Sequence, residues 1–99
     1  EVERVFEVLR GAKTAMSQNW NRRYRANLAK MKSGDVFELA EVIRNLSWRN
    51  REKGLSTGER RMLESAKQIL ISELVLAQEA DEEKVVDTLD RVLGQGFST

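Results

Sequence analysis

The sequence predicts an all-α fold, a compact bundle of five helices with a long central fourth helix, in a single domain over residues 1–99. Apolar residues recur at the spacing of a helix face in five segments, and no stretch alternates apolar and polar residues for long enough to form a strand. Glycines separate these segments, and the chain contains no proline. With 99 residues, 40% apolar and 33% charged, the composition is typical of one small soluble globular domain.

The first two helices are predicted from apolar stripes that end near glycine. The first stripe consists of Val2, Val5, Phe6 and Leu9, and Gly11 ends it. A loop over Lys13–Gln18 follows. The second stripe consists of Trp20, Tyr24, Leu28 and Met31, and Gly34 stops it. Because the aromatic rings lie on these stripes, we expect them in the core, with Trp20 buried against the fourth helix.

The third and fourth helices are predicted to begin at capping residues. Asp35 is expected to cap the third helix, with Glu38 at its third position as in a capping box, and Gly54 closes this helix. Ser56 and Glu59 have the spacing of a capping box for the fourth helix. The second half of the fourth helix is apolar nearly all round. A helix of that kind is buried by several neighbours, so we expect it at the centre of the bundle.

The fifth helix is predicted from an acidic start and an apolar stripe. The carboxylates of Asp81–Glu83 suit the positive N-terminus of a helix. The stripe consists of Val85, Val86, Leu89, Val92 and Leu93, and Gly94 ends it. Short connections between the five segments favour packing of each helix against its neighbours.

Charge is distributed unevenly along the chain, although its net value is only +1. Residues 10–67 contain fourteen Lys or Arg against six Asp or Glu, whereas residues 68–99 contain two basic and seven acidic residues. A basic middle and an acidic end predict that one part of the domain faces a polyanion. Solvated helix faces explain the same charges equally well.

Several classes of function are excluded by residues that the chain lacks. Without Cys or His it has no disulfide, no thiolate or imidazole metal ligand, no cysteine nucleophile and no histidine base. No run of about 18 apolar residues is present to span a membrane. Two carboxylate pairs at helical spacing, Glu38 with Glu41 and Asp87 with Asp90, lie on polar faces and are expected to be solvated. The sequence therefore predicts binding and not catalysis, with no metal or cofactor, in a cytoplasmic protein.

Trp48 is the aromatic residue that departs from the stripes. On an ideal helix it lies about 140° from Ile43 and about 160° from Leu46. Its neighbours on that face are Glu41, Arg44, Asn45 and Glu52, with Arg49 and Arg51 close by. One interpretation is a ring that wedges against bases while guanidinium groups hold phosphates. The other is a ring that folds over the helix end onto Leu55 or another helix.

Further basic residues on the second and fourth helices could line the same surface. On the second helix they are Arg22, Arg23, Arg25 and Lys30, and on the fourth they are Arg60, Arg61 and Lys67. Arg60 and Lys67 share a face with Glu64, so part of this charge is paired within the helix. The cluster is a stronger indication of a binding surface than any of its members.

Four segments, in this order and spacing, resemble a known family. They are Asn-Trp-Asn-Arg-Arg-Tyr at 19–24, Ser-Gly-Asp at 33–35, Ala-Glu-Val-Ile-Arg at 40–44 and Gly-Leu-Ser-Thr-Gly-Glu-Arg-Arg-Met-Leu at 54–63. The chain is similar, from about Val2 to Leu93, to the C-terminal domain of the CarD/CdnL family of bacterial transcription regulators.

The resemblance implies a function and two partners. A separate N-terminal Tudor-like domain, which we expect to be absent from this chain, binds the β subunit of RNA polymerase. The C-terminal helical domain contacts promoter DNA at the upstream fork of the transcription bubble, in the minor groove and at phosphates, and stabilises the open complex.

A Trp late in the third helix wedges there in the family, although in some relatives it stands one residue earlier. The DNA-binding residues expected from the resemblance and the charge pattern are Trp48, Arg49, Arg51, Arg44, Arg22, Arg23, Arg60 and Lys67. Lys84 is a weaker candidate. The alternative function is a helical protein–protein interaction module whose acidic half docks a basic partner.

Overall fold

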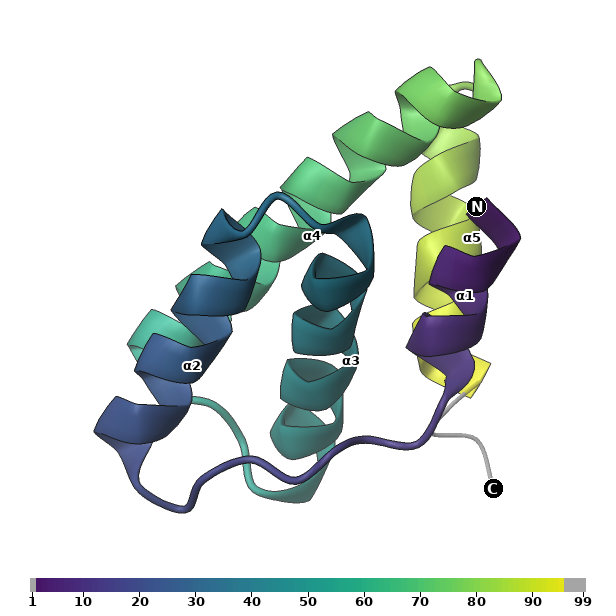
Figure 1. Ribbon diagram of the computed structural model, residues 1–99. Coiled ribbons are helices and arrows are strands. Elements are labelled where there is room, and N and C mark those ends of the chain that lie inside the picture. Colours follow the sequence, from purple (N-terminus) through teal and green to yellow (C-terminus); the bar gives the residue numbers. More distant parts are fainter. Residues whose placement is uncertain (1, 96–99) are drawn as a thin grey trace.

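A computed structural model describes residues 2–95 and confirms the all-α fold (Figure 1). Its five helices are α1 (Val2–Arg10), α2 (Trp20–Lys32), α3 (Val36–Glu52), α4 (Thr57–Gln78) and α5 (Glu82–Gln95). No strand occurs within the described part of the chain. The bundle measures 39 × 33 × 22 Å along its principal axes. The fifth helix runs one residue past Gly94, which the sequence predicted as its end.

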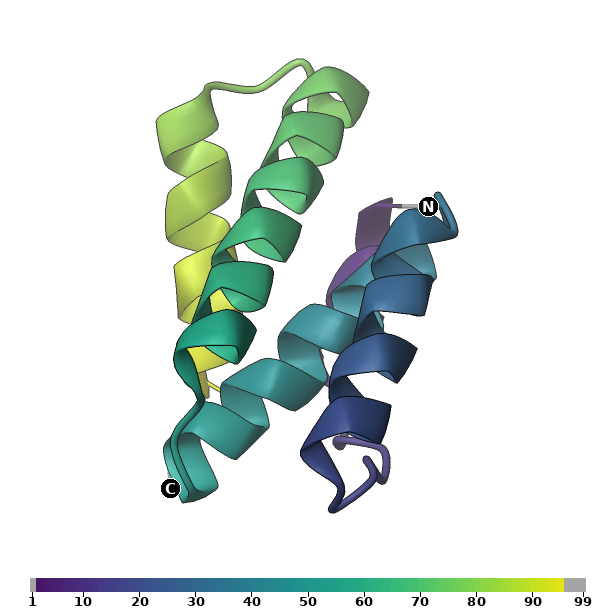
Figure 2. The same cartoon turned by 90° about the vertical axis from the view of Figure 1, so that its left-hand side faces the viewer.

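Helix α3 lies in the middle of the bundle, with α2 on one side and α1 and α5 on the other (Figure 1). Helix α4 is the longest and crosses behind the others, and it contacts all four of them. The turn between α4 and α5 lies at the end of the molecule opposite the end of α3 and the start of α2 (Figures 1 and 2). The bundle therefore has two distinct ends, one formed by the turn between α4 and α5 and the other by the end of α3 with the start of α2.

The most continuously buried segment belongs to α3, where every residue from Val42 to Ser47 is buried. The prediction that the second half of α4 is buried all round is wrong. Its Leu76 is 76% exposed and its Ile69 is 45% exposed, because α4 extends beyond α2 and α3 towards its turn with α5 (Figure 2). Helices α1, α2 and α4 and the linker surround α3, whereas α4 keeps one side open to solvent.

The predicted caps of α3 and α4 form, with one difference. Asp35 Oδ1 accepts a hydrogen bond from the backbone N–H of Phe37 at 2.8 Å, and Asn19 caps α2 in the same way through the N–H of Arg22. Glu38 takes no part in the cap of α3, so the capping box predicted there is wrong. The capping box of Ser56 and Glu59 is confirmed in full at the start of α4.

The linker between α1 and α2, residues 11–19, is held across α3 by polar side chains. The backbone N–H of Thr14 donates to Asn45 Oδ1 at 3.0 Å, and Asn45 Nδ2 donates to the Thr14 hydroxyl at 2.8 Å. Lys13 pairs with Glu52, about two helix turns further along α3. Asn45 is 1% exposed. A segment without sequence periodicity therefore covers one face of α3, and this decides the environment of several predicted site residues.

Candidate nucleic-acid interface

Seven exposed basic side chains lie at one end of the bundle, and five more, Arg4, Arg10, Lys32, Lys84 and Arg91, are exposed on the rest of the described chain. Contacts between the helices join the start of α2, the end of α3 and the start of α4 at this end, which we call the basic end (Figures 1 and 2). Its exposed cations are Lys13, Arg22, Arg25, Arg51, Lys53, Arg60 and Arg61. The turn between α4 and α5 at the opposite end carries exposed Glu79, Asp81, Glu82 and Glu83. The charge asymmetry of the sequence thus becomes a polarity of the molecule, which favours approach of a polyanion to one end.

The two tryptophans differ in how far their neighbours cover them. Trp20 is 41% exposed, so its predicted burial against α4 is wrong. It lies on the stripe that faces α4, but it is the first residue of α2, and the residue of α4 opposite it is Gly58, which has no side chain to cover the ring. Trp48, for which the sequence left a ring wedged against bases and a ring folded over the helix end as alternatives, is partly buried.

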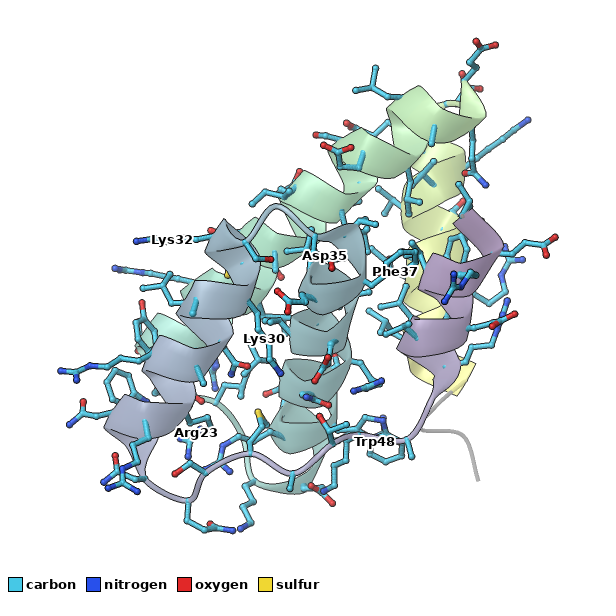
Figure 3. The ribbon with its side chains drawn as sticks, in the orientation of Figure 1. Arg23, Lys30, Lys32, Asp35, Phe37 and Trp48 are labelled. Carbon is cyan, nitrogen blue, oxygen red and sulfur yellow. The ribbon has the colours of Figure 1, made fainter. Side chains whose placement is uncertain are left out.

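Trp48 is buried in part because the face of α3 on which it lies is covered. The wheel places Trp48 off the apolar stripe, and Figure 3 shows it near the lower end of α3, on the side towards α1. One turn earlier on that face, Arg44 donates to the carbonyl of Val8 and Asn45 bonds to Thr14.

Arg23 and Arg44 are buried, which removes both from the exposed surface. Arg23 is 3% exposed and forms a bidentate pair with Glu59, at 2.7 Å from Nε and 3.3 Å from Nη2. Arg44 is 7% exposed, and its guanidinium bonds to Val8, Thr14 and Asn45. Both cations hold elements of the fold together, so neither is placed to contact phosphates as the sequence suggested.

A chain of hydrogen bonds links Trp20 to this buried pair. Trp20 Nε1 donates to Ser56 Oγ at 2.9 Å, and Ser56 Oγ donates in turn to Glu59 Oε1. Burial alone would raise the pKa of Glu59, but the hydrogen bonds from Arg23 and Ser56 outweigh it, so the pKa lies below its ordinary value. Glu59 therefore stays ionised and joins the cap of α4, the start of α2 and the linker.

Two hollows at the basic end are lined by three further predicted residues, Arg49, Arg51 and Lys67. One of about 380 Å³ lies between α3, α4 and α5 and brings together Arg51 and Lys67, with Ser47 and Asp90 in its lining. The other, of about 350 Å³, lies between the linker and α3 and is lined by Arg49 with Lys13 and other residues. The Nε–H of Arg49 is buried without a hydrogen-bond partner among the described residues. Arg49 and Arg51 therefore line different hollows, on different sides of α3.

Arg22 and Arg60 are exposed at the starts of α2 and α4, as a phosphate contact requires. Lys84 lies near the acidic turn and is remote from them. Sequence reasoning missed Ser47, which is 8% exposed and faces the larger hollow.

The paired carboxylates show no arrangement for acid–base chemistry. Glu41 accepts a hydrogen bond from Lys30 at 2.7 Å, and this bond lowers the pKa of its carboxyl despite partial burial. Asp87 and Asp90 are exposed. Within residues 2–95, no group of three acidic side chains is placed to hold a metal ion, and none of the helices described is both long and apolar enough to cross a bilayer.

The described chain is a small α-helical bundle with a basic end, an acidic end and an exposed tryptophan at the start of α2. Residues 4–90 match the family model described as "CarD, C-terminal domain", and the chain belongs to this family of transcription regulators. It is also 39% identical over 66 residues to "Putative transcription factor YdeB" of Bacillus subtilis (strain 168). That match covers 67% of this chain and 43% of the relative, so the chain spans less than half the length of the relative.

Proposed function

We propose that this chain is the DNA-binding domain of a bacterial RNA polymerase-associated regulator that contacts the upstream edge of the promoter bubble and stabilises the open complex. The observation that carries this proposal is the polarity of charge. The basic end joins three helix termini, while the acidic turn lies at the far end of the bundle. Lys and Arg side chains on one surface neutralise phosphates, and this term dominates the affinity of proteins for DNA.

Five predicted basic residues remain as candidate phosphate contacts. They are Arg22, Arg49, Arg51, Arg60 and Lys67. Cations on exposed, flexible stems position the duplex and carry no sequence information directly. A separate N-terminal domain that binds the β subunit of polymerase would hold this domain near the fork and raise its local concentration, by the arithmetic of linked binding sites. A regulator of promoter DNA would act in the bacterial cytoplasm.

The proposal predicts weak, salt-sensitive binding of the 99-residue chain to duplex DNA. A handful of phosphate contacts gives a Kd of about 10⁻⁴ to 10⁻⁶ M at physiological salt, without sequence preference. The measurement is fluorescence anisotropy of labelled 20-base-pair duplexes of two unrelated sequences, with and without a forked end, at two salt concentrations. We expect equal affinities for the two sequences and a steep loss on adding salt.

Two results would contradict this prediction. Tight binding to one closed duplex that persists at high salt would indicate a conventional reader of operator sequence. No binding at low salt would favour the alternative, a protein–protein module that uses the acidic turn and the exposed Leu76.

Trp48 is retained in the proposal as the candidate wedge, and its partial burial changes the expected effect of its removal. Trp48→Ala is predicted to lower the free energy of unfolding by about 1–3 kcal/mol, less than the penalty for a fully buried aromatic. It is also predicted to reduce the preference of the chain for forked over closed duplex. The two measurements are urea denaturation and the anisotropy titration, with Trp48→Phe as the control that keeps an aromatic ring. Unchanged fork preference in a folded Trp48→Ala variant would remove Trp48 from the interface.

A further inference from the structure

We propose that a groove along α4, in the half of the molecule away from the basic end, docks a basic amphipathic helix of a partner protein. This α4 groove consists of two adjoining hollows of about 140 and 100 Å³, which share Val36 of α3 and Glu73 of α4. Beside them α4 leaves two large apolar side chains exposed, Ile69 and Leu76. Scattered exposed apolar residues are ordinary, whereas apolar residues grouped within a polar rim mark an interaction site.

The two hollows follow one another along α4. The first lies between the end of α2, the start of α3 and α4, and its α4 side consists of Ile69 and Glu73. The second lies between α1, α3 and α4, and Glu73 and Ala77 belong to its α4 side. Since these three residues are four positions apart in turn, the hollows are offset by about one helix turn, roughly 6 Å. Side chains at i and i+4 of a partner helix have the same spacing.

The floor of the α4 groove is apolar. Buried Leu39 lines the first hollow, and buried Val5 and Leu74 line the second. A cavity of about 150 Å³ with apolar walls admits a benzene ring, so each hollow has room for about one large apolar side chain. An amphipathic helix that places such anchors into a groove is a recurrent mode of peptide recognition.

Leu76 extends the apolar face beside the hollows. On an ideal helix Ile69 and Leu76 lie about 20° apart, and both lie within about 60° of Glu73. This half of α4 extends beyond α2 and α3 towards its turn with α5 (Figure 2), so its neighbours leave Leu76 uncovered. A helix in the α4 groove would fill both hollows and cover Leu76.

The charge beside the α4 groove selects a basic partner. Residues 68–83 contain five Asp or Glu and no Lys or Arg. Glu73 is exposed between the two hollows, and Asp35 lines the first of them. Two nearby cations are directed elsewhere, since Lys32 points away from the bundle (Figure 3) and Arg4 lies over an aromatic ring of α3. Lys and Arg that flank the apolar anchors of a partner helix would meet these carboxylates, whereas an acidic helix or a nucleic acid would be repelled.

The experiment uses a labelled helical peptide of about 15 residues, a length at which an isolated helix begins to be stable. Its leucines recur at the spacing of one helix face, and all its other residues are lysine. Fluorescence anisotropy measures its affinity for the chain, and we expect saturable binding. A peptide with glutamate in place of each lysine, and one of the same composition with its leucines scattered round the helix, are expected to bind at least about 10-fold more weakly.

Variants of the chain test the charge and the apolar face separately. Glu73→Lys is expected to weaken binding of the leucine–lysine peptide about 5- to 10-fold, because an exposed attraction becomes a repulsion of similar size. Glu64→Lys is the matched control, since Glu64 is also exposed and lies about 180° round the same helix from Glu73. It should change the affinity less than about twofold. Ile69→Ser with Leu76→Ser is expected to weaken binding about 10-fold through lost apolar burial, with an unchanged circular dichroism spectrum.

Amide chemical shifts locate the bound peptide on the unmodified chain. We expect ¹⁵N–¹H spectra to change along residues 69–77 and at Val36. Changes confined to residues 79–83, or equal weakening by Glu64→Lys and Glu73→Lys, would show attraction by net charge alone and overturn the proposal. Absence of peptide binding would overturn it as well. Dimerisation of the chain in analytical ultracentrifugation that Leu76→Ser abolishes would overturn it by assigning the α4 groove to a second copy.

Duplex binding is a separate readout, because the basic end and the α4 groove lie on different parts of the molecule. Ile69→Ser with Leu76→Ser is expected to leave the affinity for duplex DNA unchanged, and an equal loss of duplex and peptide binding would contradict a separate docking surface. Absence of duplex binding by the unmodified chain would overturn the proposed function, while peptide binding still decides the α4 groove.

Discussion

Glu59→Ala is expected to lower the free energy of unfolding by about 3–5 kcal/mol, because it leaves the guanidinium of a buried arginine without its carboxylate. Arg23 is 3% exposed and Glu59 is 1% exposed, and the two are joined by a bidentate pair. The same substitution removes the hydrogen bonds that the backbone N–H and the hydroxyl of Ser56 donate to the Glu59 carboxylate, whereas the bond from the backbone N–H of residue 59 to Ser56 Oγ remains. Urea denaturation followed by circular dichroism measures the loss.

Removal of both charges is the control for this prediction. The double variant Arg23→Met with Glu59→Met buries no unpaired charge, so its loss should be smaller than the sum of the two single losses. Glu64→Ala, on an exposed side of the same helix, should change stability by less than about 0.5 kcal/mol. Additive losses in the double variant would show that the pair is not coupled and that the cap alone accounts for the effect.

The pH dependence of the free energy of unfolding tests whether the ionised Glu59 carboxylate stabilises the fold through its pair with Arg23. The pKa of Glu59 in the folded protein lies below its ordinary value of 4.5, so the unfolded chain binds the proton more readily. The contribution of the carboxylate is therefore complete above that ordinary value and is lost as pH falls through the lowered pKa. Glu59→Gln resembles a protonated Glu59 at every pH. The stability difference between the unmodified chain and Glu59→Gln should shrink between pH 7 and pH 3, and a constant difference would contradict the assignment.

Local signals in the sequence predicted the helices and most of their ends correctly. Ser56 and Glu59 form a capping box that depends on residues three positions apart, and Gly34 and Gly54 adopt positive φ values of 80° and 81° at helix ends. These features need no information about the rest of the chain. The all-α fold follows from them together with the apolar stripes.

The environment of the two tryptophans could not be predicted in this way, because it depends on segments far apart in the chain. Trp48 lies where the helical wheel places it, but the linker, held by Thr14 and by the pair of Lys13 with Glu52, covers that side of α3. Trp20 lies on the predicted stripe, but Gly58 of α4 leaves its ring open. Periodicity gives the direction of a side chain and not what lies beyond it.

The buried arginines were misjudged for the same reason. Arg23 finds Glu59 across 36 positions, and Arg44 finds the carbonyl of Val8 across 36 positions. A charged residue is assigned to solvent by default, because burial is costly unless the charge is paired and hydrogen-bonded. Only the packed structure shows that both conditions are met, and this leaves the exposed cations of the basic end as the testable set.

Replacing the exposed cations Arg22 and Arg60 together with alanine is expected to weaken duplex binding about 60- to 100-fold at 0.1 M salt. Each phosphate contact contributes about 0.9 to the slope of log K against log salt, which corresponds to about 8- to 10-fold at this concentration. The slope should fall by about 1.8 for the pair. Both side chains are exposed at helix starts, so the free energy of unfolding should change by less than about 1 kcal/mol.

The matched control removes the same charge from other parts of the surface. Lys32 points away from the bundle near the end of α2 (Figure 3). Lys84 is exposed in the first turn of α5, next to the acidic turn. Lys32→Ala with Lys84→Ala has the same net charge as the test variant but keeps the basic end intact. If DNA responds only to net charge, the two double variants will weaken binding equally. If the basic end is the interface, the control will keep nearly all of the affinity and the full salt slope, because screening removes the influence of charges that lie more than about 10 Å from the phosphates at 0.1 M salt.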